Sequence, residues 1–329
     1  MMRQTILEIT KSLKNTRMFE VVRYTASKKQ EWDEFVDGAK NGVFLFKRDY
    51  MDYHADRFVD CSLMIYKGGR LMALMPANIS SEILYSHQGL TFGGLIHSLK
   101  STSVDILDAL KVVNEYASEL GVKQVVYKTI PYIYDKYPSQ EDVYALFRQN
   151  NFRQIACNIS TTIEQESRLG FSTLRNRGVK KAKKNMVRVF ESDDFKAFWD
   201  ILQENLSEKY DTKAVHSYEE ICLLKEKFAD NIKLYVAKYM GKIVGGVVMY
   251  ISSEVAHSQY ISASAKGKEL GCLDLIFDVL INDIYSGYKY FDFGTSTEHQ
   301  GQYLNESLIF QKEGFGGRAV CYNSYIYEL

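Results

Sequence analysis

The residues best suited to chemistry gather near the C-terminus. Lys312 stands between a predicted helix and the glycine-rich turn 314–317. Because glycines let a substrate approach the backbone closely, we expect Lys312, with Phe315 and Gly316, to bind an anionic group. The structural alternative is a solvated lysine at a helix C-terminus, where the helix dipole favours a cation.

Two further titratable residues are expected on strands. Asp292 alternates with Phe291 and Phe293, so its side chain should leave the strand on the opposite face. His257 lies on another predicted strand, with Gln259 on the same face. Asp292 and His257 are candidate catalytic residues, because a carboxylate and an imidazole can accept or hold a proton. Hydrogen bonding within a strand or loop is the structural alternative for both.

The loop 296–305 is the most polar segment of the chain that resembles a ligand-binding loop. Glu298 in this loop is a third catalytic candidate, as a base or as a group that orients the acceptor. Tyr303 and Asn305 are candidates for substrate binding. Loops are often polar for solubility alone, and this remains the alternative for all three residues.

A basic segment without any acidic residue occupies the middle of the chain. Its cations are Arg175, Arg177, Lys180, Lys181, Lys183, Lys184 and Arg188. Helical spacing would place Arg177, Lys181, Lys184 and Arg188 on one face, where like charges repel and an anionic partner would help. We expect a subset of Arg175, Arg177, Lys181 and Lys184 to bind phosphates of tRNA or of a nucleotide-linked sugar, in one cleft with Lys312. A solvated surface is the alternative.

Composition bounds the class of protein. The 329 residues include 41 basic and 41 acidic side chains, and this neutral balance weakens an interpretation as an RNA-binding protein and argues against DNA. The five cysteines are widely spaced without a CxxC pair, so neither a disulfide framework nor a metal site is expected. No signal-like or membrane-spanning apolar run is evident, which predicts a cytoplasmic protein.

The elements that must position these residues occur twice. Amphipathic helices are predicted after Ser27, which forms a capping box with Gln30, and after Ser192. Hairpins at 61–77 and 232–250 follow, then helix-to-strand segments at 103–129 and 272–296, then short helix, turn and strand at 145–164 and 308–329. The pattern predicts a duplicated mixed α/β unit, with domains at 1–165 and 191–329 joined by a basic linker or helix at 166–190.

This order of elements resembles the GNAT acyltransferase fold, and two copies in tandem resemble the FemAB (Fem-type) transferases. The segment FDFGTSTEHQGQYLNESLIFQKEGFGG (291–317) looks like the Fem-related strand with an aspartate and its Lys-x-x-Phe-Gly turn, and LRNRGVKKAKKN (174–185) looks like the family's basic segment. The resemblance implies two mixed, mainly antiparallel sheets flanked by helices. It also implies that Lys312 contacts acceptor phosphates.

The resemblance further implies an activity. Fem-type enzymes transfer an amino acid from aminoacyl-tRNA to a peptidoglycan precursor, and GNAT relatives transfer acyl groups from acyl-CoA to amines. The GNAT pyrophosphate loop reads Gln/Arg-x-x-Gly-x-Gly/Ala, whereas SAKGKELGCLDL here is out of pattern. If acyl-CoA binds, Lys266 and Gly271 would contact it, although the chemistry requires no cofactor. No heptad run corresponds to the Fem arm, which favours the armless members.

These observations predict a Fem-like N-acyl or aminoacyl transferase that acts on an amine of a cell-envelope or sugar-nucleotide precursor. Direct attack needs no covalent nucleophile, in keeping with a sequence that has no GxSxG, Walker or HExxH motif. The expected partners are an anionic small-molecule acceptor and aminoacyl-tRNA. The alternative is a non-catalytic duplicated GNAT scaffold that binds an anionic glycan precursor or a protein.

Overall fold

The computed structural model describes residues 18–210 and 214–329. The chain forms two compact units, of which the first combines two stretches of sequence and the second is continuous. Tyr322–Leu329 at the C-terminus belongs to the first unit, which otherwise ends at Cys157, and the second unit is Asn158–Cys321. This division differs from the expected domains: the last strand of the chain completes the first unit, and the basic segment lies inside the second.

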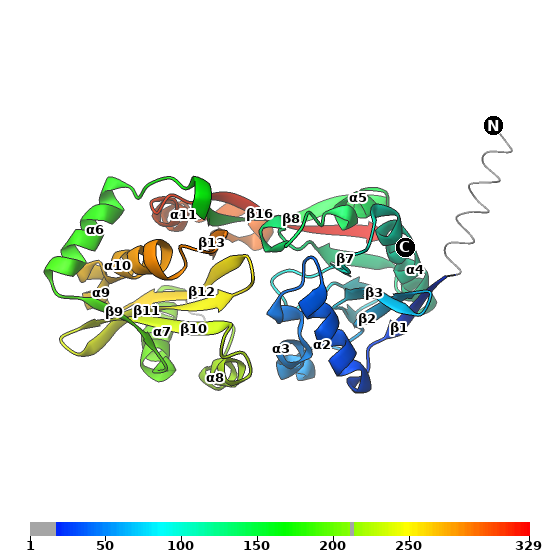
Figure 1. Cartoon of the computed structure of the whole chain (residues 1–329), viewed down its shortest axis with the longest axis horizontal. Helices are drawn as coiled ribbons and strands as arrows, with labels where there is room; N and C mark the ends of the chain where they lie inside the picture. The colour runs from blue at the N-terminus through cyan, green and yellow to red at the C-terminus, as the bar shows by residue number, and fades with distance from the viewer. Residues whose placement is uncertain (1–17, 211–213) are drawn as a thin grey trace. The chain divides into compact units, whose positions relative to one another are not determined.

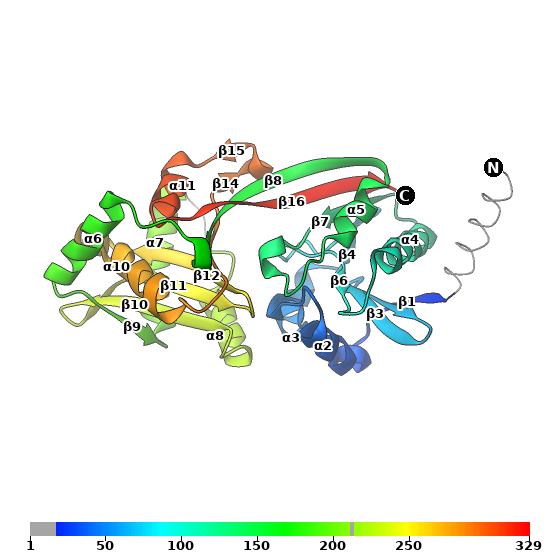
Figure 2. The same cartoon turned by 45° about the horizontal axis from the view of Figure 1, so that its top comes forward.

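The first unit contains a four-stranded antiparallel sheet in the order β1-β2-β3-β6 and a second group of strands, β4, β5, β7 and the end of β16. The strands are β1 (Phe19–Arg23), β2 (Leu63–Lys67), β3 (Arg70–Met75), β4 (Asn78–Ser80), β5 (Ile83–Tyr85), β6 (Ile96–His97) and β7 (Gln124–Lys128). The helices are α2 (Lys29–Gly38), α3 (Arg48–Met51), α4 (Ser103–Glu119) and α5 (Glu141–Phe147). Figure 2 shows β7 beside β16.

Helix α4 follows the sequence pattern closely. Thr102 and Asp105 form a capping box at its start, and the residues at its apolar positions, among them Ile106, Leu110 and Val113, are buried. The first helix of the repeat differs from expectation. Helix α2 begins at Lys29 without a side-chain cap, because the hydroxyl of Ser27 bonds to Thr25. The expected capping box of Ser27 and Gln30 is therefore wrong.

The second unit is a sheet in the order β8-β13-β12-β11-β10-β9 with helices around it (Figure 1). Its strands are β8 (Asn150–Glu164), β9 (Arg188–Ser192), β10 (Ile232–Tyr239), β11 (Lys242–Ile251), β12 (Val255–Ala263), β13 (Tyr290–Thr295), the short β14 (Thr297–Glu298) and β15 (Tyr303–Leu304), and β16 (Arg318–Glu328). The helices are α6 (Thr173–Lys184), α7 (Phe195–Tyr210), α8 (Tyr218–Lys227), α9 (Ala265–Leu270), α10 (Cys272–Val279) and α11 (Glu306–Glu313).

The pairing within this sheet is antiparallel except between β12 and β13. Helix α10 is rich in apolar residues and packs on one face, where Phe277, Phe291, Phe293 and Phe315 form an aromatic cluster. Both expected hairpins are present, as β2 with β3 and as β10 with β11. None of the helices described is long and apolar enough to cross a membrane.

Candidate active site

The central feature of the second unit is a point where two parallel strands separate. Strands β12 and β13 are paired only from Val255 with Tyr290 to His257 with Asp292. Beyond this point β12 stays paired with β11 as far as Ala263, while β13 pairs with β8. A bulge at Gln259 shifts the register of β12 just after the last pair. The two strands therefore open a gap directly after His257 and Asp292.

Asp292 is the centre of a hydrogen-bond network at the start of this gap. Because His257, Asp292 and Thr162 occupy directly paired positions on three adjacent strands, their side chains share one face of the sheet. The Asp292 carboxylate accepts from Ser160 Oγ at 2.5 Å, from Thr162 Oγ1 at 2.7 Å and from His257 Nδ1 at 2.7 Å. Complete burial opposes ionisation, but the hydrogen bonds and the charge of His257 hold the pKa of Asp292 below its usual range.

The contact with Asp292 orients the imidazole of His257. A carboxylate can only accept, so Nδ1 carries the proton and Nε2 presents its lone pair when the ring is neutral. The ring lies against Gly294, where a Cβ would stand only 3.2 Å from His257 Cε1. The His257 side chain is 15% exposed, so the ring is held from one side and reachable from the other. This arrangement suits a general base.

Lys312 on α11 is buried next to the same strand. Its ammonium donates to the carbonyls of Gly294 and Thr295, each at 2.8 Å. Burial lowers the pKa of Lys312 to about 8, and the negative charge of Asp292 partly opposes that shift. The alternative of a solvated lysine is thus wrong. An ammonium has three protons. Two of them are donated to these carbonyls, so the third remains for a ligand.

A pocket of about 220 Å³ lies where β12 and β13 have separated. Ile261 and Ala263 of β12 and Phe293 of β13 form part of its wall. Its other apolar lining residues are Leu202, Leu206, Leu273, Phe277, Leu308 and Phe315, and its polar ones are Asn205, Ser262, Lys268, Gln311 and Lys312. The pocket can hold an apolar group with a polar end near Lys312.

The glycine-rich turn after Lys312 has mainly a packing role. Phe315 is buried against Phe277 and Phe293, and it also lines the pocket. Gly316 has a φ of +94°, and a Cβ there would lie 2.2 Å from the carbonyl oxygen of Leu169. Gly316 is therefore needed for the close approach of two chain segments, and this contact alone accounts for the glycine.

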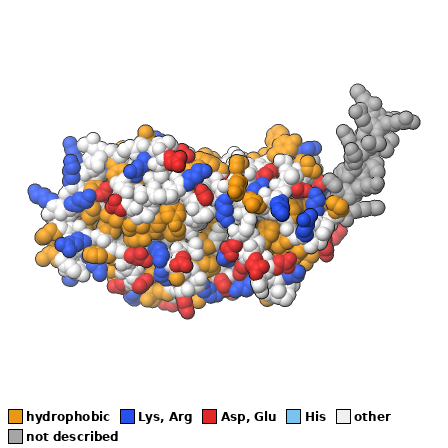
Figure 3. Space-filling view, viewed as in Figure 1, with side chains coloured by type: hydrophobic (Ala, Val, Ile, Leu, Met, Phe, Trp, Pro, Cys, Tyr) orange, Lys and Arg blue, Asp and Glu red, His pale blue; other side chains and the backbone are white. Residues whose placement is uncertain are grey.

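Most of the basic segment forms helix α6, and its cations differ in their contacts and exposure. Arg175 pairs with Asp274 at 2.6 Å and lies over the ring of Phe315. Arg177, Lys181 and Lys184 are exposed, and Figure 3 shows basic side chains at the edge of the molecule where α6 lies. Arg188 is on strand β9, which corrects its expected place on the same helical face.

None of the four basic candidates lines the pocket that Lys312 lines. The Lys312 ammonium is enclosed and bonded to two backbone carbonyls, whereas Arg177, Lys181 and Lys184 face solvent. Lys312 and the basic segment therefore do not meet in this pocket, and an anion-binding cleft shared by them stays a prediction. Binding of an anion by the exposed face of α6 is a separate question.

The polar loop candidates also stand apart from Asp292. Asn305 caps α11 by accepting from the backbone of Leu308 at 3.1 Å, and its amide donates to Glu298 at 3.3 Å. Tyr303 is 54% exposed on β15. These three side chains lie on or beside the small hairpin of β14 and β15 and do not line the pocket.

The loop that would hold a CoA pyrophosphate is folded into helix α9. The amide of Gly267 donates to Ser264 Oγ at 3.2 Å, and the amide of Lys268 donates to the carbonyl of Ser264 at 2.9 Å. Lys266 pairs with Glu269 on the surface. Gly271 has a φ of +73°, and a Cβ there would lie 2.8 Å from the carbonyl oxygen of Gly178. Structural contacts account for both expected cofactor residues, so this loop fits a pyrophosphate poorly.

Two site residues were not anticipated from the sequence. Ser160 and Thr162 lie on β8, in the polar run Asn-Ile-Ser-Thr-Thr that precedes Ile163. Hydroxyls within a strand that is otherwise expected to be buried are a usable signal, because a buried polar group needs a partner. The partner itself could not be named, since β8 pairs with a strand more than a hundred residues later.

Comparison with known proteins finds similar folds. Residues 173–303 match the family model described as an acetyltransferase (GNAT) domain. The chain is similar to FemX, with 11% identity, coverage of 94% of this chain and 97% of that one, and a TM-score of 0.67. It is also similar to L-PGS from Bacillus licheniformis, with 13% identity, coverage of 93% and 92%, and a TM-score of 0.56. No curated protein sequence matches the chain.

A third similar structure is a conserved protein of unknown function from Bacteroides thetaiotaomicron, with 11% identity, coverage of 95% of this chain and all of that one, and a TM-score of 0.61. At this level of identity the solved structures show similarity of fold alone. The family model matches residues 173–303, which lie within the second unit. The expected likeness to the GNAT and Fem-type fold and the mixed α/β architecture are confirmed, and residues 173–303 match the model of the acetyltransferase (GNAT) domain.

Proposed function

We propose that the second unit transfers an acyl or aminoacyl group to an amine by direct attack, with His257 as general base. The observation that carries the proposal is the His257 imidazole, fixed by Asp292 at the point where β12 and β13 separate. A neutral ring held in this way offers Nε2 to an incoming ammonium or amine. Lys312 of helix α11, bonded to the carbonyls of Gly294 and Thr295 at the end of β13, supplies a positive charge nearby.

The steps balance without a covalent enzyme intermediate. The amine nitrogen of the acceptor attacks the carbonyl carbon of the donor, and His257 Nε2 takes the proton that the nitrogen loses. The remaining proton of the Lys312 ammonium donates to the oxyanion that forms, an interaction that is strongest in the transition state. The intermediate then expels the donor's leaving group, which recovers the proton from His257.

The donor and the acceptor follow from the resemblance to Fem-type enzymes and from the pocket. An apolar pocket of about 220 Å³ beside Lys312 suits an acyl or amino-acid side chain. The closed loop at Ser264–Gly271 favours a donor other than acyl-CoA, such as aminoacyl-tRNA. We propose as acceptor an amine of a cell-envelope or sugar-nucleotide precursor.

Single-turnover transfer tests the proposal. Aminoacyl-tRNA and acyl-CoA donors are offered with amine-bearing peptidoglycan and sugar-nucleotide precursors, and product is followed by mass spectrometry. We expect His257→Ala to lower the rate about a hundredfold to ten-thousandfold, as for loss of a general base. His299→Ala is the matched control, because His299 is exposed between β14 and β15, whereas His257 is bonded to Asp292. Equal rates for wild type and His257→Ala would refute the role of His257.

The alternative is a non-catalytic scaffold. The enclosed, carbonyl-bonded Lys312 and the closed cofactor loop favour it, since both are also compatible with a purely structural role. A scaffold would bind the precursor without any turnover, and binding would be the same in wild type and His257→Ala. Turnover in the wild type excludes it.

A further inference from the structure

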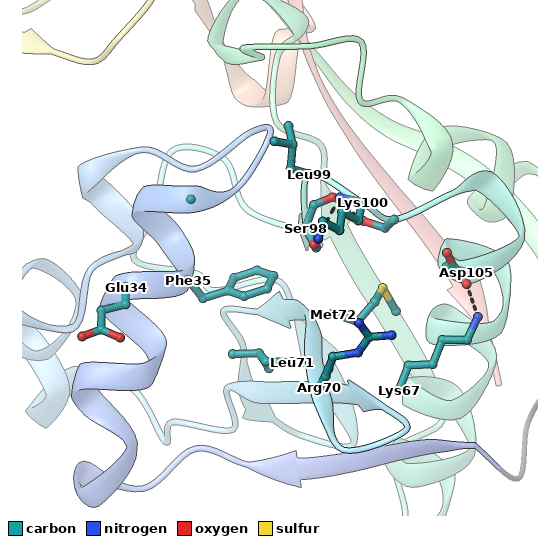
Figure 4. Close-up of a pocket in the computed structure, with 12 residues that line it drawn as sticks. Glu34, Phe35, Lys67, Arg70, Leu71, Met72, Ser98, Leu99, Lys100 and Asp105 are labelled. Carbon is teal, nitrogen blue, oxygen red and sulfur yellow. Dashed lines mark hydrogen bonds and ion pairs between the residues drawn. The ribbon is translucent and has the colours of Figure 1, made fainter.

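A pocket in the first unit has no part in the proposed transfer. It has a volume of about 540 Å³ and lies between helix α2, the turn that joins β2 to β3, and the residues before helix α4 (Figure 4). This volume is within the range of small-molecule sites, about 300 to 1,000 Å³. All twelve lining residues belong to the first unit, so the pocket is independent of the candidate active site.

The charges around this pocket do not cancel. Lys67 forms an ion pair with Asp105, so these two charges offset each other. Partial burial opposes ionisation of Asp105, but the hydrogen bonds from Lys67 and Thr102 hold its pKa below the usual range. The carboxylate of Glu34 accepts from Gln30 at 2.8 Å and points away from the cavity in Figure 4.

Two cations remain after this pairing. Among the described residues, the guanidinium of Arg70 and the ammonium of Lys100 have neither an ion pair nor a side-chain hydrogen bond. Figure 4 shows the Arg70 side chain directed into the cavity, from the strand that faces the loop carrying Lys100. The like charges of Arg70 and Lys100 repel each other across the cavity. An anion bound between them would be attracted to both and would offset this repulsion.

Side chains, rather than backbone amides at the start of α4, must bind the ligand in this pocket. The capping box of Thr102 and Asp105 uses amides at the start of α4, so these are not free for a ligand. Arg70 can present a planar fork of donors, which matches the oxygens of a phosphate better than a single point charge does. The hydroxyl of Ser98 also lines the cavity and can add a hydrogen bond.

Another part of the wall is apolar. Phe35, Leu71 and Leu99 line the cavity beside the two cations. Figure 4 shows Phe35 and Leu71 directed toward the space between α2 and the β2–β3 hairpin. A bare inorganic ion would leave this surface wet, whereas an organic substituent would cover it. We propose that the first unit binds a small organic phosphate ester, with Arg70 and Lys100 on the phosphate and Phe35 against the organic group.

Titration calorimetry on the full chain tests this proposal with three probes: inorganic pyrophosphate, uridine diphosphate and malonate. We expect uridine diphosphate to bind more tightly than pyrophosphate, and malonate to bind least. A charge-assisted contact is worth a factor of about ten to a hundred in affinity, so Arg70→Ala and Lys100→Ala should each weaken uridine diphosphate by that factor. Phe35→Ala should weaken uridine diphosphate and leave pyrophosphate unchanged.

The control is Lys111→Ala, which removes one positive charge from the exposed face of α4, away from the pocket. It should bind all probes as the wild type does. The proposal is overturned if no phosphate probe binds, if Arg70→Ala binds as the wild type does, or if malonate matches uridine diphosphate. Binding to phosphatidylglycerol vesicles without binding to the soluble probes would also overturn it, because the source would then be a membrane.

Discussion

His257 and Asp292 are the last paired residues of the parallel ladder between β12 and β13, and their side chains meet at 2.7 Å. The backbone pairing fixes the two Cα atoms, and the buried carboxylate fixes the ring. A pair of side chains placed at a point of strand separation is held by the sheet and still borders the gap between the strands. The position therefore combines rigidity with access, which a base on a surface loop would lack.

The first prediction concerns Asp292→Asn. An asparagine amide would donate to Nδ1 of His257, so the proton would move to Nε2 and the base would be lost. We expect the transfer rate to fall about a hundredfold or more, with little change in donor affinity. Single-turnover rates and donor titrations measure the two effects separately.

Ser160→Ala is the comparison for Asp292→Asn. It removes one of the two hydroxyls on Asp292 Oδ1 but leaves the contact with His257. We expect a loss of stability of about 1 kcal/mol and a much smaller loss of rate. If both variants lose rate equally, the hydroxyl network rather than the tautomer of His257 sets the activity.

The second prediction concerns pH and Lys312. Burial lowers the pKa of this lysine to about 8, so its charge is present at pH 7 and is lost as the pH rises through about 8. If the ammonium stabilises the oxyanion, the rate should fall about tenfold for each pH unit above that value. Lys312→Arg keeps its charge to far higher pH, so its profile should lack this alkaline limb.

The same shift predicts the stability of the fold. The folded pKa lies below the unfolded value, about 10.4, so between the two values the unfolded chain binds more protons than the folded chain. This group's contribution to stability should therefore increase as the pH rises from about 8 to about 10. Denaturant unfolding of wild type and Lys312→Met across that range isolates the contribution. If the difference in unfolding free energy between wild type and Lys312→Met does not vary with pH, the lysine does not titrate in that range.

Much of the fold could be predicted from the sequence because it rests on local signals. The hairpin turns and the apolar periodicity of α4 both act within about four residues. His257 and Asp292 could be named as candidates for the same reason. Their contact could not be derived, since it depends on a parallel pairing of distant strands.

The unit boundaries show where local signals end. Each copy ends in a strand, but the end of β16 pairs with β7 in the first unit, and the end of β8 pairs with β13 in the second. A sequence repeat gives the order of elements but not which copy each strand joins. Ser160 and Thr162 reach Asp292 only through this pairing, so the sequence could mark them as hydroxyls on a buried strand but could not name their partner.

The third prediction concerns Arg175. Its pair with Asp274 is about 15% exposed on both sides, and burial raises the pKa of Asp274 while Arg175 opposes that shift. We expect Arg175→Met to cost about 1 to 3 kcal/mol of unfolding free energy, since the carboxylate loses its partner. Lys183→Met is the control: its partner is Asp278 and the lysine is 59% exposed, so the cost should stay below about 1 kcal/mol. Equal costs would contradict a structural role for Arg175.

The fourth prediction concerns Gly271 and acetyl-CoA. Because a Cβ at Gly271 would meet the Gly178 carbonyl oxygen at 2.8 Å and φ is positive, Gly271→Ala should cost about 1 to 3 kcal/mol. Gly287→Ala has open space around it and should cost far less. Acetyl-CoA should bind weakly to wild type and to both variants in calorimetry. If wild type binds acetyl-CoA tightly and only Gly271→Ala loses this binding, at unchanged stability, the loop is a CoA site.

The last prediction concerns the exposed face of α6. Arg177, Lys181 and Lys184 face solvent, and we propose that they contact phosphates of a tRNA donor. Each phosphate contact contributes about 0.7 to 0.9 to the slope of log affinity against log salt. Replacing all three with Gln should therefore weaken aminoacyl-tRNA at low salt and reduce that slope by about 2 to 3. The same change at Lys196, Lys227 and Lys242, which are also exposed in this unit, removes equal net charge and should alter the slope by less than about 1. Equal effects of the two triple variants would mean that net charge alone attracts the RNA and that α6 has no specific part.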